Sequence, residues 1–471
     1  MKRRDFFHNT ALTTAGLSFL LPFQGNVLGN DFDVANTLGK KKKAKNIIFL
    51  VSDGMSMGTL TLSELYLKRK LGKESNWLNL YRDKRVNRSL MDMASASSMV
   101  TDSSAASSSW GGGHRVTNGR LNIGPNGEEY VPILQKFKKA GKRVGCVTTV
   151  PITHATPAGF CINAKSRGEQ ADIAEMYLDL HFDVMMGGGE KYFVNTEKGR
   201  DLFVDFTKKG YEVLRSTQDM NKSTGDKPIL GVFDYEALPY ELDRQQDPLK
   251  METIPSLKEM TAKAIEIMKD HKDGFCLQVE GGKVDWAAHA NDAFALIHDQ
   301  IAFDEAVAVA IDFAEKDKNT LVIITTDHGN SNPALYYGKN TDKHFESIFQ
   351  VKHTTDFILQ SVERDEKIQD FIDRVYHYQG YQILPEEAAS LLTTYKDQKE
   401  GGTYNHYNLP FGAYANIMKK HTSIQFGGND HTSDYVELAM FGPGSQQLKP
   451  FIKNTDLHYF MLEVAEVEHK I

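Results

Sequence analysis

Side chains that can bind metal ions recur at the ends of apolar runs along this 471-residue chain. Continuous apolar runs such as 46–52 are typical of strands buried on both faces of a parallel sheet. In open α/β sheets, ligands bind just outside the carboxyl ends of the strands. Four separate strands are therefore expected to deliver oxygen or nitrogen donors to one edge of one sheet. These donors are Asp53, Thr156, Glu280, and the adjacent Asp327 and His328.

Two further groups of residues suit a metal ion. Asp285 and His289 are four residues apart, so on a helix both side chains project from one face and can bind one ion. Taken alone, an acid four residues before a histidine is usually only a surface pair. His431 is another imidazole candidate and is equally ambiguous by itself. A mixed set of aspartate and histidine without cysteine is typical of catalytic sites that keep open coordination positions.

Ser103 is the candidate nucleophile. It follows Asp102 and begins a run of small residues, 103–109, that allows close approach of a ligand. If a helix begins at Ser103, its free N–H groups favour an anion there. The chain has no Gly-x-Ser-x-Gly elbow, so a serine activated by a metal ion is a better interpretation than a hydrolase triad. A helix start without any chemistry is the alternative.

These side chains require a frame of strands and helices to position them. Strand-like runs alternate with helical segments, one with a capping box at Ser256 and Glu259 and another a long Ala-rich helix after His289. This order predicts an α/β domain with a doubly wound, mostly parallel central sheet flanked by helices. The predicted strands are 46–52, 144–150, 182–186, 274–279 and 321–326, and the remaining predicted helices are 133–140 and the stretch from Ile173 to Leu180.

Two segments fall outside this frame. Residues 340–420 are rich in Tyr, Lys, His and Gln without a clear buried strand, so we expect a crown-like insertion over the site or along one edge. Near the N-terminus, Lys2-Arg3-Arg4 and the apolar segment 11–23 resemble a twin-arginine signal peptide, residues 1–30, followed by a linker over 31–45. An amphipathic N-terminal helix is the alternative. The α/β domain is then expected over 46–471.

The composition excludes several classes of protein. Hydrophobic residues make up 41% and charged residues 25%, which is ordinary for a globular protein and unlike a disordered or fibrous chain. The formal charge of −7, from 55 basic and 62 acidic residues, argues against a nucleic-acid partner. Outside the leader no run is long and apolar enough for membrane insertion. The three cysteines lack Cys-x-x-Cys spacing, so we expect them to be buried rather than metal-bound.

Together the motifs resemble those of the alkaline phosphatase family. Their order and approximate spacing match the family from about residue 46 to 445, which covers nearly all of the predicted domain. The matching motifs are Asp53-Gly54-Met55, Thr101-Asp102-Ser103, Ala155-Thr156-Pro157, Ser166-Arg167, Glu280-Gly281-Gly282 with Asp285 and His289, Thr326-Asp327-His328, and His431-Thr432.

The resemblance implies a set of roles. Asp285, His289 and His431 are expected to bind one Zn²⁺, Asp53, Asp327 and His328 a second Zn²⁺ beside Ser103, and Asp53, Thr156 and Glu280 a third ion, normally Mg²⁺. This division fits ion chemistry, because hard Mg²⁺ prefers oxygen donors while imidazole suits Zn²⁺. Arg167 resembles the arginine that holds two phosphate oxygens, for which a guanidinium is well shaped, and Asp102 is expected to orient it.

Two positions depart from the best-studied bacterial pattern. His154 stands where that pattern has an aspartate near the third metal, so His154 is a further candidate ligand and the identity of that metal is open. Trp286 stands where the pattern has a lysine that reaches phosphate through water. The loss of that positive charge predicts weaker retention of phosphate and faster product release.

The resemblance implies hydrolysis of small phosphate monoesters through a phosphoserine intermediate, in the periplasm or after secretion, with a homodimer as one possible assembly. Phosphodiesterases share the metal core but often use threonine and lack the arginine. Sulfatases need a modified cysteine in a Cys-x-Pro-x-Arg setting, which no cysteine here has. An exported phosphate- or metal-binding protein without catalysis is the remaining alternative, although no ligand or nucleophile is missing.

Overall fold

The computed structural model describes residues 43–195, 199–363, 365–395 and 408–469. The predicted signal peptide, residues 1–30, and the linker as far as residue 42 lie outside the described residues. The described chain from residue 43 onward belongs to one compact unit. None of its helices has the length and apolar character needed to cross a bilayer.

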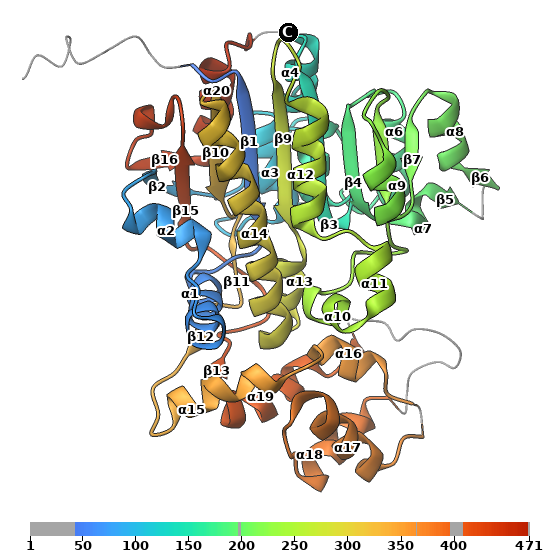
Figure 1. The fold of residues 1–471 in the computed structure, drawn as a ribbon, viewed down its shortest axis with the longest axis vertical. Coiled ribbons are helices and arrows are strands. Elements are labelled where there is room, and N and C mark those ends of the chain that lie inside the picture. The colour runs from blue at the N-terminus through green and yellow to red at the C-terminus, as the bar shows by residue number, and fades with distance from the viewer. Residues whose placement is uncertain (1–42, 196–198, 364, 396–407, 470–471) are drawn as a thin grey trace, which may run out of the picture. The chain divides into compact units, whose positions relative to one another are not determined.

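A ten-stranded sheet forms the centre of the fold (Figure 1). All of its strands run parallel except β15, which is antiparallel to both of its neighbours. The predicted mostly parallel sheet is therefore confirmed. In spatial order the strands are β16 (Phe451–Lys453), β2 (Asn87–Asp92), β15 (Val436–Phe441), β10 (Thr320–Thr325), β1 (Asn46–Ser52), β9 (Phe275–Gly281), β3 (Arg143–Pro151), β4 (Val184–Gly188), β8 (Ile229–Val232) and β7 (Glu212–Leu214).

Helices cover both faces of the sheet, as a doubly wound fold requires. Side chains of β1 alternate between two hydrophobic clusters: Phe49 packs with α3, α5 and α20 on one face, and Leu50 packs with α12 and α14 on the other. Figure 1 shows α12 and α14 in front of the sheet and α3 behind it. The helices of the two layers include α2 (Asn76–Arg82), α3 (Ser103–Gly111), α4 (Ile133–Lys139), α5 (Ala155–Cys161), α6 (Gln170–Tyr177), α8 (Leu202–Lys208), α12 (Leu257–Met268), α14 (Ala293–Asp317) and α20 (Asn454–Val464).

Most of the predicted elements are present. The capping box is confirmed, with Ser256 and Glu259 each bonded to the other's backbone at the start of α12. All three cysteines are buried, as expected. The predicted helix through Leu180 ends at Tyr177, and Met176, expected on its buried face, is 41% exposed. Strands β2, β7, β8, β15 and β16 were not predicted, because most are short or carry polar side chains that weaken the apolar signal.

The region 340–420 contains helices that the sequence did not predict. They pack around a third hydrophobic cluster shared with α1 (Met57–Tyr66) and the first turn of α14. Their apolar positions, such as Phe371 and Val375 on α17, are buried although the region as a whole is polar. The helices are α15 (Thr341–Glu346), α16 (Thr355–Gln360), α17 (Ile368–Gln379), α18 (Pro385–Thr393) and α19 (Phe411–Thr422).

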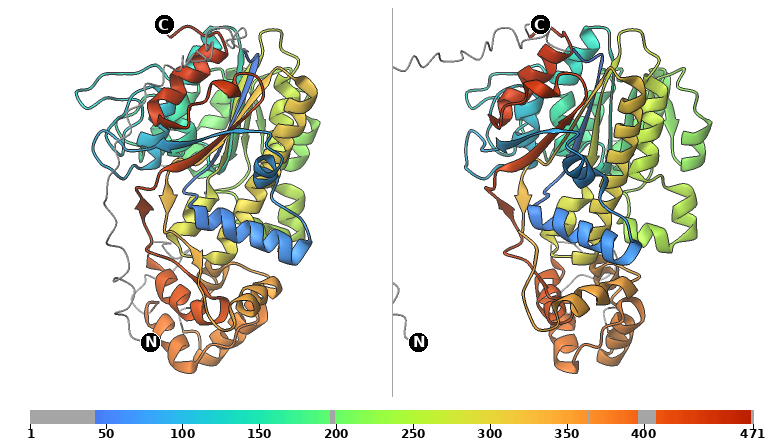
Figure 2. Two further views of the ribbon diagram at one scale, coloured as in Figure 1. Left: turned by 90° about the vertical axis from the view of Figure 1, so that its left-hand side faces the viewer. Right: turned by 60° about the vertical axis from the view of Figure 1, so that its left-hand side comes forward.

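Two short strands join the base of this insertion. β12 (Ala334–Leu335) pairs with β13 (Ile424–Gln425), so the chain leaves and re-enters the α/β frame at neighbouring points. In Figures 1 and 2 the insertion lies at the end of the sheet where β1 and β9 reach their carboxyl ends.

The remaining helices and strands are η1 (Leu67–Leu71), α7 (Glu190–Phe193), α9 (Thr217–Lys222), α10 (Glu241–Gln246), α11 (Pro248–Thr253), α13 (Lys283–His289), η2 (Ser347–Gln350), η4 (Ser445–Gln447), β5 (Val194–Asn195), β6 (Arg200–Asp201), β11 (Gly329–Asn330) and β14 (His431–Thr432).

Candidate metal centre

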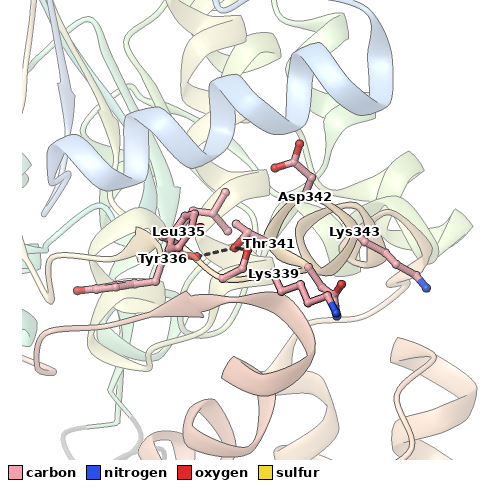
Figure 3. Close-up of a pocket in the computed structure, with 9 residues that line it drawn as sticks. Leu335, Tyr336, Lys339, Thr341, Asp342 and Lys343 are labelled. Atoms are coloured by element: carbon pink, nitrogen blue, oxygen red, sulfur yellow. Dashed lines mark hydrogen bonds between the residues drawn. The ribbon is translucent and has the colours of Figure 1, made fainter. Parts of the chain in front are cut away.

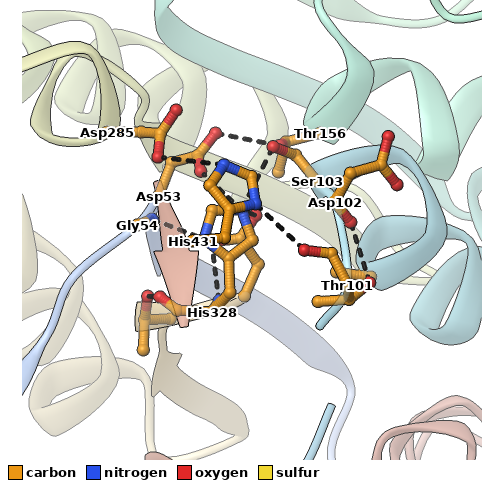
Figure 4. Close-up of polar contacts among 12 residues, drawn as sticks. Asp53, Gly54, Thr101, Asp102, Ser103, Thr156, Asp285, His328 and His431 are labelled. Carbon is orange, nitrogen blue, oxygen red and sulfur yellow. Dashed lines mark hydrogen bonds and ion pairs between the residues drawn. The ribbon is translucent and has the colours of Figure 1, made fainter. Parts of the chain in front are cut away.

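The four strands expected to carry metal donors are consecutive neighbours, in the order β10, β1, β9, β3. Their register brings their carboxyl ends into line, since Val51 of β1 lies opposite both Thr325 of β10 and Glu280 of β9. Asp53 follows β1 directly, and its Oδ2 lies 3.2 Å from Thr156 Oγ1 at the start of α5. The donors therefore gather at one edge of the sheet (Figure 4).

Asp285, His289 and His431 form one group of potential ligands. The two imidazole Nε2 atoms are 3.0 Å apart, and Asp285 Oδ2 lies 3.4 Å from His289 Nε2. His289 Nδ1 bonds the carbonyl of Asn429, and His431 Nδ1 bonds that of Thr101. Because a carbonyl accepts only from a protonated nitrogen, each Nδ1 carries hydrogen, and each Nε2 is the atom left to bind a proton or a metal ion.

The charges in this group are strongly coupled. Burial lowers the pKa of His289, but the Asp285 carboxylate outweighs burial and raises that pKa to about 9. Burial lowers the pKa of His431 to about 4, and the charge of His328 acts in the same direction. Two imidazole nitrogens so close together are compatible with one shared cation or with one proton between them.

Asp53, Asp327 and His328 surround Ser103 and adjoin the first group. His328 Nε2 lies 3.2 Å from Asp327 Oδ2, 3.6 Å from Asp53 Oδ1 and 3.3 Å from Ser103 Oγ. Asp327 Oδ1 accepts from the N–H groups of Gly54 and His328, which leaves Oδ2 to face the site. Asp285 also reaches the Asp53–His328 pair, so the first two groups share a border. The rings of His328 and His431 stack with centroids 3.6 Å apart.

A third group consists of Asp53, Glu280 and His154. His154 Nδ1 lies 3.8 Å from Glu280 Oε1, and neither atom has a hydrogen-bond partner. Thr148 on β3 donates to Glu280 Oε2 and orients this carboxylate. Sequence reasoning missed Thr148. The available signal was the strand register, which places Thr148 directly opposite Glu280 and which no single strand reveals.

Asn330 is a second residue that the sequence analysis missed. Its Nδ2 donates to Asp285 Oδ1 over 2.7 Å, and its backbone N–H donates to Ser56 Oγ over 3.0 Å. Asn330 follows the Thr326-Asp327-His328 motif within two residues, so proximity to that motif was the usable signal. Asn330 bonds Asp285 Oδ1, whereas His289 lies next to Asp285 Oδ2.

The site concentrates negative charge that the protein itself does not balance. Asp53, Glu280, Asp285 and Asp327 are each at most 4% exposed, and within the described part of the chain only histidines lie at ion-pair distance from them. Burial raises the pKa of Asp53, and the neighbouring Asp327, Asp285 and Glu280 raise it further. Unpaired buried charges cost several kcal/mol each. The donor set therefore fits bound cations.

An anion-binding arrangement adjoins these groups. Ser103 is the first residue of α3, whose N-cap Asp102 accepts from Ala105 N over 2.9 Å. Arg167 Nη1 donates to Asp102 Oδ2 over 3.2 Å, and Arg167 Nη2 lies 3.1 Å from His154 Nε2. The nucleophile candidate, a guanidinium and the metal donors thus face one space. Such a set can bind a tetrahedral anion and transfer a phosphoryl group to a serine.

A separate pocket of about 630 Å³ lies on the segment from Leu335 to Lys343 (Figure 3). Figure 3 shows Asp342 pointing toward the helical segment after α1, where Arg69 pairs with it over 3.0 Å. None of the predicted site residues lines this pocket. It is therefore distinct from the metal centre.

The α/β fold and the donor groups beside a serine and a guanidinium define the class of metal-dependent hydrolases that act on phosphate esters. A sequence profile of the alkaline phosphatase family matches residues 44–467, and the chain belongs to that family. It is 30% identical over 471 residues to alkaline phosphatase 4 of Bacillus subtilis, with 97% of each chain covered. It is 31% identical over 441 residues to alkaline phosphatase 3 of the same organism, with 92% of this chain and 91% of the relative covered. The crystal structure of Thermus thermophilus alkaline phosphatase matches with a TM-score of 0.84 and 28% identity, covering 96% of each chain.

Proposed function

We propose that Ser103 is the nucleophile of phosphate monoester hydrolysis in this protein. The observation that carries the proposal is its position at the first turn of α3, with Oγ 3.3 Å from His328 Nε2 and among three groups of metal donors. Bound cations supply Lewis-acid charge and lower the pKa of nearby hydroxyl and water oxygens.

The reaction has two displacements at phosphorus. In the first, Ser103 Oγ loses its proton and bonds to phosphorus while the ester P–O bond breaks, and the leaving oxygen departs as an alcohol. In the second, the oxygen of water bonds to phosphorus, the Oγ–P bond breaks and Ser103 regains a proton. Arg167 grips two phosphoryl oxygens in both steps, and Asp102 and His154 hold the guanidinium in place.

We further propose two Zn²⁺ ions and one Mg²⁺ ion as the resident metals. The sets Asp285–His289–His431 and Asp53–Asp327–His328 contain imidazole and suit Zn²⁺. Asp53, Thr156 and Glu280 offer only oxygen and suit Mg²⁺, whereas the added nitrogen of His154 favours a transition metal. Metal analysis of the purified protein decides the third ion: a content near one Mg²⁺ per chain supports this assignment, and a third Zn²⁺ contradicts it.

The test of activity uses residues 31–471 with Zn²⁺ and Mg²⁺ at alkaline pH. One aryl leaving group is presented as the phosphate monoester, the phosphate diester and the sulfate ester. The monoester is expected to be preferred, and a chelator is expected to abolish its turnover. Preference for the diester or sulfate would overturn the role given to Arg167. Absence of turnover by metal-loaded protein would favour a binding protein.

We also propose an export signal, a catalytic domain with an insertion, and a homodimer. The leader at 1–30 is proposed to direct export through the twin-arginine route, after which residues 46–471 act as a periplasmic or secreted catalytic domain, with 340–420 as its insertion. Replacing Arg3 and Arg4 by lysine should then retain the enzyme in the cytoplasm. Light scattering at a stated concentration tests the proposed homodimer.

A further inference from the structure

Lys283 is a buried lysine on α13, the helix that also carries Asp285 and His289, and burial lowers the pKa of its ammonium. It is the first residue of α13 and is 7% exposed. Its Nζ lies 3.5 Å from the centroid of the Tyr240 ring and 4.9 Å from that of the Trp286 ring. Among the described residues its ammonium forms no ion pair, and four carboxylates act on it only from longer range. These are Asp356, Asp299, Asp243 and Glu236.

The ammonium thus contacts two aromatic rings. Lys283 and Trp286 are three residues apart on α13, so their side chains lie on the same face of the helix. Tyr240, which precedes α10, supplies the second ring. Cation–π contacts are stronger where water is excluded, as it is here. Lys283 therefore restricts the indole of Trp286 to one orientation.

A continuous line of contacts runs from Trp286 to the guanidinium. The rings of Trp286 and His154 meet at 72° with centroids 6.3 Å apart, which is an edge-to-face contact. His154 Nε2 in turn lies 3.1 Å from Arg167 Nη2. With Nε2 accepting from Arg167, His154 Nδ1 is directed toward Glu280 Oε1, 3.8 Å away, where it can serve as a metal donor. The position of the Trp286 indole therefore affects the orientation of the Arg167 guanidinium.

We propose that Lys283 is a positioning residue for phosphate, acting through Trp286 and His154 on Arg167. The proposal rests on the proposed role of Arg167 as the phosphate clamp. Without the ammonium, the indole and the His154 ring gain freedom, and Arg167 spends less time in the orientation that grips two oxygens. Phosphate and substrate then bind less tightly, while the reactivity of Ser103 is unaffected.

The experiment compares Lys283→Met, which keeps the length of the side chain, with Lys283→Arg, which keeps a cation that stacks on aromatic rings. Lys263→Met on α12 is the matched control, because Lys263 is also buried, at 8% exposed, while its ammonium pairs with Glu266 over 3.4 Å and with none of the site residues. Calorimetry measures equilibrium binding of inorganic phosphate, and steady-state kinetics gives KM and kcat. Lys283→Met should weaken phosphate binding and raise KM by about tenfold, less than the roughly thirtyfold that the full free energy of a desolvated cation–π contact would give, because only part of it reaches the guanidinium.

In the same assays kcat should change little, and Lys283→Arg should restore most of the phosphate affinity. Lys263→Met should leave both KM and phosphate binding unchanged. If Lys283→Met does not fold, Tyr240→Leu removes the second ring that contacts the ammonium and should also weaken phosphate binding. Unchanged phosphate affinity in either folded variant would overturn the proposal.

A double-mutant cycle tests the route through Trp286. In a Trp286→Ala background, Lys283→Met should change phosphate affinity by less than about twofold, because the contact that transmits its effect is already absent. Equal effects in both backgrounds would contradict the route. Arg167→Ala separates the two levels of the argument. If it also leaves phosphate affinity intact, the proposed clamp is wrong, whereas if only Lys283→Met is silent, the inference about Lys283 alone fails.

Discussion

Replacement of Asp102 should separate its contribution to stability from its contribution to phosphate binding. Its carboxylate accepts from Ala105 N over 2.9 Å, Ser104 Oγ over 2.7 Å, Gly119 N over 2.9 Å and Arg167 Nη1 over 3.2 Å. Asparagine can still cap α3, whereas alanine cannot. Neither substituent offers Arg167 a charged acceptor.

The magnitudes follow from these bonds. Asp102→Ala loses the cap and leaves Ala105 N–H without an acceptor, so it should lower the free energy of unfolding by about 2 to 3 kcal/mol. Gly119 N–H keeps Ser104 Oγ as a second acceptor at 3.0 Å, which limits the loss. Asp102→Asn should cost less than about 1 kcal/mol. Loss of the partly exposed pair with Arg167 is worth about 1 kcal/mol, so phosphate should bind about fivefold more weakly in both variants.

Two assays on metal-loaded protein check this separation: denaturant unfolding and competitive inhibition by inorganic phosphate. Ser216→Ala is the control for a lost cap, because Ser216 caps α9 beyond β7 at the sheet edge. It should lower stability by about 1 kcal/mol and leave phosphate inhibition unchanged. If Asp102→Asn binds phosphate as tightly as the wild type, Asp102 does not orient Arg167 and the reasoning is refuted.

The stability from Asp102 also has a predictable pH dependence. Burial raises the pKa of Asp102, but the charge of Arg167 and the hydrogen bonds from Ala105 and Ser104 outweigh it and lower that pKa below 3.8. A depressed pKa in the folded state means that the contribution is complete above pH 3.8 and is lost as the pH falls through the lowered value. The stability difference between wild type and Asp102→Asn should therefore shrink on acidification, and a constant difference would show that charge is not its source.

Three further changes have clear expected outcomes. Ser103→Ala should lose most monoester turnover yet keep its metal content and unfolding temperature; near-full turnover would remove Ser103 from the reaction. Trp286→Lys should tighten inhibition by inorganic phosphate, since an ammonium would then face the anion, and unchanged inhibition would contradict the predicted effect of the tryptophan. Thr148→Val should leave Glu280 Oε2 buried without a donor, which costs about 2 kcal/mol, and should raise the Mg²⁺ concentration needed for half-maximal activity. Equal Mg²⁺ dependence in Thr148→Val and wild type would show that Thr148 does not orient the third group of donors.

The parts of the fold that could be predicted are those marked in the sequence by continuous apolar runs or by a capping box. The runs at 46–52 and 321–326 are continuous and apolar because β1 and β10 are buried on both faces, and the capping box marks α12 through purely local hydrogen bonds. β2 is partly exposed and reads NRSLMD, so its place in the sheet is not visible in its sequence. The helices within 340–420 bury only narrow apolar stripes against one another, and a window dominated by polar residues conceals them.

The sequence alone indicated the candidate donors and the candidate nucleophile, because strand ends and motif order are local properties of the chain. How these groups are connected became visible only in the tertiary structure. The contact of His154 with Arg167, the bond from Thr148 to Glu280 and the stacking of Lys283 on Tyr240 join segments from different strands and loops. Such contacts depend on strand register and on helix packing across the sheet. Strand register and helix packing leave no periodic pattern in the sequence, so these contacts can be seen only in the folded protein.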